Sequence, residues 1–446
     1  MDNKNISEKD LKKSLTLVIL GMTFGNVFFV VTGGAALTGF TRALGASNFV
    51  YGVIMAMPVI GGVVQVFISF YLEQTGKRKF AFLASGFIHR LLWIPIAFIP
   101  FIIPSCYRGL RIFSVTLLIT LASASSSVVG ISFLSWMGDL VPKNIRGSFF
   151  SKRTMISTIS AAIVGLISGF VLDKVDNFTG FALIFCIVSI FGALDIFCFF
   201  WVHHPVMRTS KEKQKIGKLL LEPLKNKNYM RFIAFIAFWN FGVNFAGPFF
   251  NVYMLEKLKM SYFTIVIFSQ IGGNLITILF IRKWGRLVDK YGSKPIMTIC
   301  VSLVFFLPIL WIFTSPTNIW MVLVINLISG LIWPGFDMTN LNQSVWLAPE
   351  KNRSMYIALF TLITSLVGIA GAYICGGAFM QYATPLFDSL KLPFVMGRNF
   401  SSFDALFIIS TILRTIAIFV FIRRYEEPNS KSVSIIFKDL KVKLFS

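Results

Sequence analysis

Residues 285–295 read GRLVDKYGSKP and residues 69–79 read SFYLEQTGKRK, and these two stretches decide the fold. Each stretch joins the end of a long apolar run to the start of the next one. Each also places an acid three residues before a glycine that is followed by basic residues. A second pair of segments, 142–147 (PKNIRG) and 349–354 (PEKNRS), repeats in the same order. The chain therefore consists of two halves with the same organisation, and their matching loops lie on one face of a membrane.

The composition is that of a membrane protein. Of the 446 residues, 56% are hydrophobic and only 14% are charged, and the mean hydropathy is +0.75. Soluble domains usually carry about a quarter charged residues. Twelve apolar runs are each long enough to cross a hydrocarbon core about 30 Å thick. These runs are residues 14–40, 49–72, 80–104, 112–140, 154–173, 180–202, 230–255, 262–284, 295–314, 318–347, 355–381 and 403–422. The sequence therefore predicts an all-α polytopic membrane protein, in which the first run is a retained helix rather than a signal peptide.

The distribution of basic residues predicts the orientation. With the N-terminus placed inside, the inner segments contain 32 of the 42 lysines and arginines and the outer loops contain 8. Because cytoplasmic loops carry an excess of basic residues, we expect both termini in the cytoplasm and the protein in the cell membrane (plasma or inner). The net charge of +23 is thus a topology signal facing the lipid bilayer, and no basic soluble domain is available to bind nucleic acid. The five cysteines form no metal-ligand spacing, so we expect no metal or cofactor, and we expect a monomer.

The two halves define the domain organisation. Residues 1–202 are predicted to form an N-terminal six-helix bundle and residues 230–424 a C-terminal six-helix bundle. A cytoplasmic linker over 203–229 joins the two bundles, and a cytoplasmic tail follows over 425–446. Linker and tail both place apolar residues at helical spacing among lysines, which fits either a helix on the membrane surface or a solvated segment.

The loop over 285–294 resembles the signature loop of the major facilitator superfamily, which that family carries between helices 2 and 3 and again between helices 8 and 9. The first-half copy departs from the pattern, because Ser69 replaces the first glycine and Glu73 replaces the aspartate. Segments 142–147 and 222–228 also resemble that family's loop between helices 4 and 5 and its lead-in to helix 7. The resemblance implies twelve transmembrane helices in two pseudo-repeated six-helix bundles and a transport function. It does not indicate the substrate.

The repeated loops also suggest an inner gate. An acid at a helix end can stabilise a neighbouring helix N-terminus and pair with a nearby arginine. The family uses such a latch to close the inner ends of its helices, and the resemblance implies the same use here. The gate candidates are Glu73, Gly76, Arg78, Asp139, Arg146, Gly285, Arg286, Asp289, Gly292 and Arg353. Because the second copy keeps the full pattern, we expect Asp289 to dominate closure.

Polar residues inside the apolar runs predict a substrate path. Polar groups are costly in hydrocarbon and usually face the bundle interior or a water-filled cavity. At 100° per residue, polar side chains fall on one side of helix 7 and on one side of helix 10, and by resemblance helices 1, 4, 7 and 10 line the family's central cavity. The predicted path consists of Asn26, Trp239, Asn240, Asn244, Asn251, Gln270, Asn274, Asn326, Trp333, Asp337 and Asn340. The alternative is that these amides bond neighbouring helices to each other.

Three charged residues within the apolar runs carry separate predictions. Asp337 is the only acid well inside a presumed cavity helix. It could couple transport to protons by binding and releasing one, bind a cationic substrate, or pair with a basic residue such as Arg414. Arg90 in helix 3 and Asp195 in helix 6 lie at similar depths, so we expect an intramembrane ion pair between them.

These features together favour a secondary active transporter of a small organic solute, working by alternating access as a symporter or antiporter with protons or Na+. The sequence has no phosphate-binding GxxxxGK[ST] loop, so an ion or substrate gradient would supply the energy. A polytopic membrane enzyme and a non-transporting sensor on a transporter fold are the alternatives. We expect no enzyme, because the three histidines lack any accompanying catalytic motif. Drug or metabolite efflux and uptake of a sugar-like nutrient both fit the sequence.

Overall fold

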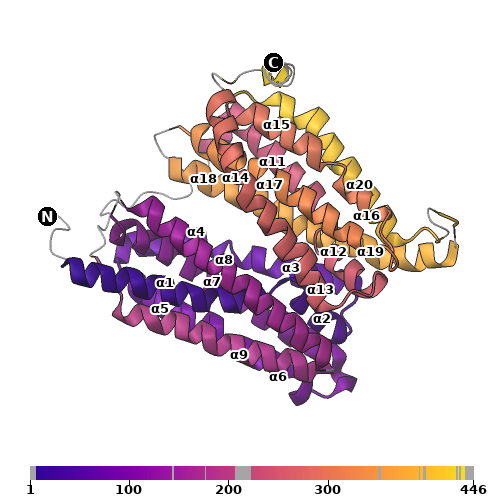
Figure 1. The fold of residues 1–446 in the computed structure, drawn as a ribbon, viewed down its shortest axis with the longest axis horizontal. Helices are drawn as coiled ribbons and strands as arrows, with labels where there is room; N and C mark the ends of the chain where they lie inside the picture. The colour runs from indigo at the N-terminus through magenta and orange to yellow at the C-terminus, as the bar shows by residue number, and fades with distance from the viewer. Residues whose placement is uncertain are drawn as a thin grey trace. The chain divides into compact units, whose positions relative to one another are not determined.

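The computed structural model describes residues 7–142, 145–175, 177–205, 222–349, 353–390, 392–394, 398–427, 430 and 433–436. Figure 1 traces the chain from the N-terminus in indigo to the C-terminus in yellow. By its contacts the chain divides into two compact units. The first comprises residues 1–213 with 261–266, and the second comprises 214–260 with 267–446. In the described ranges, β structure is limited to an isolated bridge between Pro393 and Asn399.

The first unit is a bundle whose long helices run along a common direction (Figure 1). Its helices are α1 (Glu8–Val31), α2 (Gly34–Ala43), α3 (Asn48–Gly61), α4 (Val64–Thr75), α5 (Arg78–Leu91), α6 (Trp93–Ile102), η1 (Ser105–Tyr107), α7 (Arg108–Leu140), α8 (Arg146–Lys174), α9 (Asn177–Cys198), η2 (Phe199–Trp201) and α13 (Tyr262–Ile265). The bundle core packs aromatic rings against one another, as where Phe82 meets Phe199 at a centroid distance of 4.6 Å.

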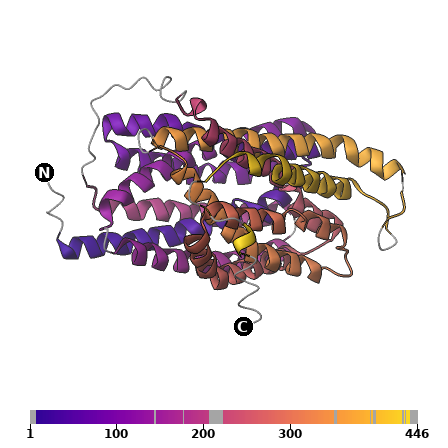
Figure 2. The same cartoon turned by 90° about the horizontal axis from the view of Figure 1, so that it is seen from above.

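The second unit is also a bundle of long helices, and Figure 2 shows these helices from above. Its elements are η3 (Glu222–Lys225), α11 (Lys227–Ala246), α12 (Phe249–Val252), η4 (Tyr253–Lys257), α14 (Gly272–Tyr291), α15 (Ser293–Val304), α16 (Leu307–Ile312), α17 (Trp320–Trp346), α18 (Arg353–Ser365), η6 (Leu366–Ala370), α19 (Gly371–Leu390), α20 (Ser402–Ile416), η8 (Ala417–Phe421) and η9 (Ile422–Arg424), with η5 (Val266–Ile271) joining α13 to α14. Close approach of small residues holds the helices together. A Cβ on Gly330 of α17 would lie 2.2 Å from the carbonyl oxygen of Gly273 in α14.

The prediction of an all-α polytopic membrane protein is confirmed. Within the described residues, eleven helices are long and apolar enough to cross a membrane. The predicted run over 49–72 differs, because it is divided into α3 and α4 at Gly62 and Val63. The run over 14–40 is likewise interrupted at Thr32 and Gly33, between α1 and α2. Hydropathy averaged over a window does not detect these breaks, because the residues on both sides of each break are equally apolar.

The sequence repeat corresponds to a repeated turn geometry. Gly76 after α4 has φ +66° and Gly292 after α14 has φ +94°. Both values lie in the region that glycine occupies without the steric cost of a Cβ atom. Earlier in each half, the hydroxyls of Ser47 and Ser261 accept hydrogen bonds from backbone N–H groups at the starts of α3 and α13. The shared residues of the two halves are therefore those that begin and end helices.

Two carboxylates stabilise helix starts on the other side of the bundles, away from these loops. In the first unit, Asp173 of α8 accepts hydrogen bonds from the backbone N–H groups of Tyr262 (2.8 Å) and Phe263 (2.9 Å), which stabilises the start of α13. In the second unit, Arg398 donates to both oxygens of Asp404, at 2.6 and 2.7 Å, and Asp404 forms a capping box with Ser401 at the start of α20. These contacts attach the segments between helices to the bundles.

Candidate functional site

An aromatic cluster joins α11 to α17 in the second unit. The ring centroids of Trp239 and Trp333 are 6.4 Å apart, and Phe336 lies 5.7 Å from Trp239 and 5.5 Å from Trp333. Trp239 is fully buried, and its Nε1 has no hydrogen-bond partner in the described part of the chain. Phe336 was not among the predicted path residues. Its position three residues after Trp333, on the same side of the helix, is a signal that could have identified it.

Asp337 lies one helical turn after Trp333, so the carboxylate and the indole share one face of α17. The Asp337 side chain is exposed and makes no hydrogen bond or ion pair with the residues described. It lies about 14 Å along the axis from the end of α17 at Trp346, near the middle of a membrane-spanning helix. The buried Arg414 does not pair with it there, and Nη1 of Arg414 instead donates to the carbonyl of Val304 at 3.2 Å.

The predicted amides of the second unit have different environments. Asn340 follows Asp337 by three residues, and its buried Oδ1 has no partner among the described groups. The side chains of Asn244 and Asn326 each donate to a carbonyl one turn earlier in their own helix, both at 2.8 Å, and Asn244 donates to that of Asn240. The other predicted amides of this unit are Asn240, Asn251 and Gln270, which are half-buried, and Asn274, which is exposed. The structure brings together Trp239, Trp333 and Phe336, and helical spacing places Asp337 and Asn340 on the Trp333 side of α17. We call these five residues the α11–α17 cluster.

Asn26 in the first unit has a different environment. Its Nδ2 donates to the carbonyl of Ser157 at 2.6 Å and so links α1 to α8. This is the helix-to-helix bond that the sequence left open as the alternative to lining a path.

Arg90 and Asp195 meet inside the first unit. Nη2 of Arg90 lies 2.9 Å from Oδ2 of Asp195, and the two side chains are only 2% and 3% exposed. The guanidinium also lies over the rings of Phe28 and Phe29, with its carbon 4.3 and 4.4 Å from their centroids. Nδ1 of His89 is 3.1 Å from Nη1 of the same arginine. The charge in the bundle interior is thus neutralised by a carboxylate and covered by aromatic faces.

A second arginine, which the sequence did not suggest, also acts on this carboxylate. Arg153 of α8 interacts electrostatically with Asp195, and the buried Nε of Arg153 and Oδ1 of Asp195 both lack a hydrogen-bond partner among the described residues. Gly25 of α1 lies against the same carboxylate, because a Cβ at that position would be 2.5 Å from Oδ2 of Asp195. Helix α1 can therefore approach the ion pair only with a glycine at this position.

Two of the predicted gate residues are joined in the first unit. Arg78 begins α5, is fully buried, and forms an ion pair with Asp139 of α7. It also donates through Nη1 to the carbonyl of Ser135 (3.1 Å), through Nη2 to that of Pro205 (2.7 Å) and through Nε to Nε2 of His204 (3.3 Å). Burial and then the charge of Arg78 lower the pKa of His204 to about 4. His204 is therefore neutral at pH 7 and accepts the hydrogen bond from Nε.

The second copy of this loop is built differently. Aligning the loops places Lys294 opposite Arg78, and the ammonium of Lys294 donates to the carbonyl of Tyr425, just after the last membrane helix. The carboxylate of Glu427 accepts from the backbone N–H groups of Ser293 (3.2 Å) and Lys294 (2.6 Å) and so caps α15. Sequence reasoning missed Glu427, because it lies in the tail, where no periodic pattern indicates a partner.

The other gate candidates make fewer contacts. Asp289 and Arg286 are exposed, and within the described ranges neither forms a hydrogen bond or ion pair. The buried Nε of Arg353 has no hydrogen-bond partner in these ranges. Gly285 is half-buried. The structure does not describe the side chains of Glu73 and Arg146. The connected network is therefore in the first copy of the loop, and the dominance of Asp289 in closure stays a prediction.

Comparison with known proteins agrees with this architecture. The family model described as Major Facilitator Superfamily matches residues 15–372 and 275–439. Similar solved structures include the nucleoside transporter NupG, with 15% sequence identity, coverage of 94% of this chain and 99% of that one, and a TM-score of 0.66. They also include a D-xylose-proton symporter, with 15% sequence identity, coverage of 95% of this chain and 99% of that one, and a TM-score of 0.63. A bacterial homologue of the iron transporter ferroportin is also similar, with 14% sequence identity, coverage of 95% of this chain and 100% of that one, and a TM-score of 0.67. No curated protein matches the sequence. At these identities the likeness shows a shared fold.

Proposed function

Because the chain belongs to the Major Facilitator Superfamily, we propose that it is a secondary active transporter that moves a small organic solute by alternating access. The observation that carries the proposal is the exposed carboxylate of Asp337 within a membrane-spanning helix. An acid at the centre of a transmembrane helix costs about 2.5–3.5 kcal/mol if it faces lipid. In this proposal the side chain therefore faces water rather than lipid.

The chemistry of the α11–α17 cluster supports a neutral, polar, ring-containing solute. Trp333 is half-buried and offers a flat apolar face for a ring, and it packs against the fully buried Trp239 and the buried Phe336. The unpartnered Nε1 of Trp239 is a donor and the unpartnered Oδ1 of Asn340 is an acceptor. A buried polar group left without a partner costs about 1–3 kcal/mol, so a solute with hydroxyl groups gains by satisfying both. An apolar drug would leave them unsatisfied, and sugars and nucleosides are therefore the first compounds to test.

Asp337 is the proposed proton-coupling residue. A carboxyl group beside apolar rings is easier to protonate than one in water, and renewed access to water favours its ionised form. A cycle in which solute binding and proton binding alternate would couple the two gradients. In this proposal the termini lie in the cytoplasm, the protein works as a monomer in the cell membrane, and protons rather than Na+ are the coupling ion.

The test begins with purified full-length protein and a thermal-shift screen of sugars, nucleosides, amino acids, peptides and drugs, since a ligand stabilises the folded state that it binds. The best ligand is then followed in proteoliposomes with and without a pH gradient. Asp337→Asn should abolish accumulation driven by the pH gradient while keeping exchange of labelled for unlabelled solute. The matched control is Asp388→Asn, which changes an exposed acid near the end of α19, and it should transport like the wild type.

Three outcomes would contradict the proposal at different levels. Normal proton-driven accumulation by Asp337→Asn would remove the coupling role and leave transport intact. Tight binding of a ligand without any flux would instead favour a non-transporting sensor, and chemical conversion of that ligand would favour an enzyme.

A further inference from the structure

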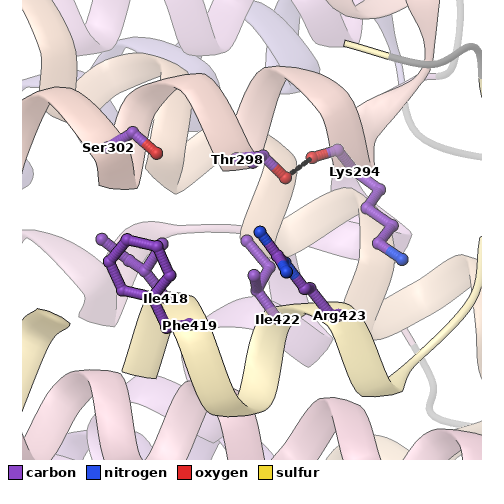
Figure 3. A pocket seen from close by; sticks show the side chains of 7 residues that line it. All are labelled: Lys294, Thr298, Ser302, Ile418, Phe419, Ile422 and Arg423. Carbon is purple, nitrogen blue, oxygen red and sulfur yellow. Dashed lines mark hydrogen bonds between the residues drawn. The ribbon is translucent and has the colours of Figure 1, made fainter. Parts of the chain in front are cut away.

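A pocket of about 360 Å³ opens between α15 and the end of the last membrane helix in the second unit (Figure 3). It is separate from the α11–α17 cluster and lies between different helices. Its lining consists of Lys294, Thr298, Ser302, Ile418, Phe419, Ile422 and Arg423. The pocket therefore combines two cations, two hydroxyls and three apolar side chains in one small space.

These groups are ordered along the helix axis. Lys294 lies in the first turn of α15 and Ser302 lies about 12 Å farther along it. Phe419, on the facing helix, is 62% exposed, and its neighbours Ile416 and Leu303 are also exposed. Exposed apolar side chains on membrane-spanning helices face lipid tails. The charged end of the pocket is thus at the end of the membrane span, and its apolar end extends into the hydrocarbon.

Arg423 supplies a cation that the protein itself leaves free in the described structure. Its side chain is exposed, makes no hydrogen bond or ion pair with the residues described, and extends across the pocket toward Thr298 (Figure 3). Lys294 uses one of its three N–H groups on the carbonyl of Tyr425. Two acids, Glu426 and Glu427, act electrostatically on Lys294, and the carboxylate of Glu427 also accepts hydrogen bonds from the two backbone N–H groups at the start of α15.

The two hydroxyls continue the polar lining inward. Thr298 donates its hydroxyl hydrogen to the carbonyl of Lys294 at 2.9 Å, which leaves its oxygen as an acceptor. The hydroxyl of Ser302 has no partner among the described residues and remains a donor. A ligand in the pocket would thus meet a donor about two turns below the cations.

The first unit provides an internal comparison. The loop alignment places Phe82 opposite Thr298 and Gly86 opposite Ser302. Phe82 is only 2% exposed and packs on Phe199, and Ile196 fills the space beside Gly86, where a Cβ would lie 2.5 Å from its Cδ1. The same position is therefore filled with apolar side chains in one half and is open and polar in the other.

We propose that this pocket binds an anionic phospholipid. The phosphate lies between the guanidinium of Arg423 and the ammonium of Lys294, an ester carbonyl accepts from Ser302, and an acyl chain lies along Phe419 and Ile418. Basic pockets between membrane helices at the cytoplasmic face suit such headgroups, and the excess of basic residues predicts that this end of the helices is cytoplasmic. The occupant is a membrane lipid rather than a soluble phosphate, because three of the seven lining side chains are apolar and one of them, Phe419, is exposed on a membrane-spanning helix.

The test measures lipid binding to purified full-length protein by native mass spectrometry, with phosphatidylglycerol, phosphatidylcholine and inorganic phosphate as separate probes. We expect phosphatidylglycerol to be retained over the other two. Arg423→Gln should weaken its binding about fivefold, the effect of one basic residue near an anionic headgroup. The matched control, Arg424→Gln, removes an equal charge from the adjacent exposed residue, which does not line the pocket, and should change binding less than twofold.

A second variant tests the pocket without changing any charge. Thr298→Phe introduces the residue that fills the corresponding position of the first unit, and it should reduce phosphatidylglycerol binding at least as much as Arg423→Gln. Equal weakening by Arg423→Gln and Arg424→Gln, together with normal binding by Thr298→Phe, would show diffuse attraction to the basic surface and overturn the proposal. Phosphate binding as tight as that of the lipid would overturn it as well. If Thr298→Phe fails to fold, the two arginine variants still decide between these outcomes.

Discussion

Replacing Asp195 by leucine should destabilise the protein more than replacing Arg90 by methionine, and making both changes together should cost less than the sum of the two single losses. The two side chains are almost fully buried and 2.9 Å apart. Breaking a buried ion pair by removing one partner costs about 3–5 kcal/mol, because the other charge is left uncompensated. Replacing both partners by apolar side chains of similar volume is often neutral or stabilising, by up to about 4 kcal/mol.

The difference between the two single changes comes from Arg153. Without Asp195, two arginines remain near each other with no carboxylate between them. Without Arg90, Asp195 still has the charge of Arg153, although the contacts of the guanidinium with Phe28 and Phe29 are lost, at about 0.5–2 kcal/mol. Asp195→Leu should therefore lie near the upper end of the 3–5 kcal/mol range and Arg90→Met near the lower end.

The assay is a double-mutant cycle on the free energy of unfolding, measured by titrating the detergent-solubilised protein with a denaturing detergent. Asp388→Leu, at an exposed acid near the end of α19, is the control and should change the free energy by less than about 0.5 kcal/mol. A double variant whose loss equals the sum of the two single losses, within about 0.5 kcal/mol, would refute the reasoning. That result would mean that the two charges do not stabilise each other.

Three further predictions concern other contacts. Gly25→Ala should destabilise the protein by about 1–3 kcal/mol, because its Cβ would lie 2.5 Å from the carboxylate of the buried ion pair. The control is Gly130→Ala, whose Cβ would have no atom within 4 Å and which should not destabilise the protein. Thermal unfolding compares the two variants. Because the pKa of His204 is about 4 in the folded protein and about 6.5 in an unfolded chain, the folded state binds fewer protons, and stability should fall as the pH is lowered from 6.5 toward 4. His204→Gln, which still offers Arg78 an acceptor, should remove that part of the stability profile, and an unchanged profile would contradict the assignment. Trp239→Phe removes the unpartnered N–H and part of a fully buried ring, so it should lower the free energy of unfolding by less than about 1.5 kcal/mol. It should also raise the half-saturating solute concentration about three- to tenfold in the proteoliposome assay.

The local features of the fold are readable in the sequence. The acid-to-glycine spacing in residues 69–79 and 285–295 predicts two equivalent turns, and Gly76 and Gly292 adopt the positive φ that such turns require. The depth of Arg90 and Asp195 in their helices predicts that they lie close together, because a charge in hydrocarbon needs a partner. Local conformation and the cost of burying a charge are properties of short segments, so a single sequence is enough to infer them.

Other features depend on which helix surfaces meet. Glu427 caps α15 from the chain's end, Arg153 approaches Asp195 from α8, and Phe336 completes the aromatic cluster with Trp239. The sequence shows which side of each helix is polar, but it does not show which helix that side contacts. Such contacts depend on the packing of segments that are far apart in the chain.

Comparison of the two halves shows most clearly which features follow from the local sequence and which follow from packing between distant segments. By itself the sequence determined that residues 69–79 and 285–295 are copies, that apolar helices flank them and that their cations lie at the same helix position. Only the tertiary structure decided what the copies became. Arg78 is buried in an ion pair next to a packed aromatic core, whereas Lys294 borders an open pocket with polar and apolar walls. The physical reason is that a turn depends on a few neighbouring residues, whereas a core or a pocket depends on the volumes of side chains such as Phe82 and Thr298 against helices from distant parts of the chain.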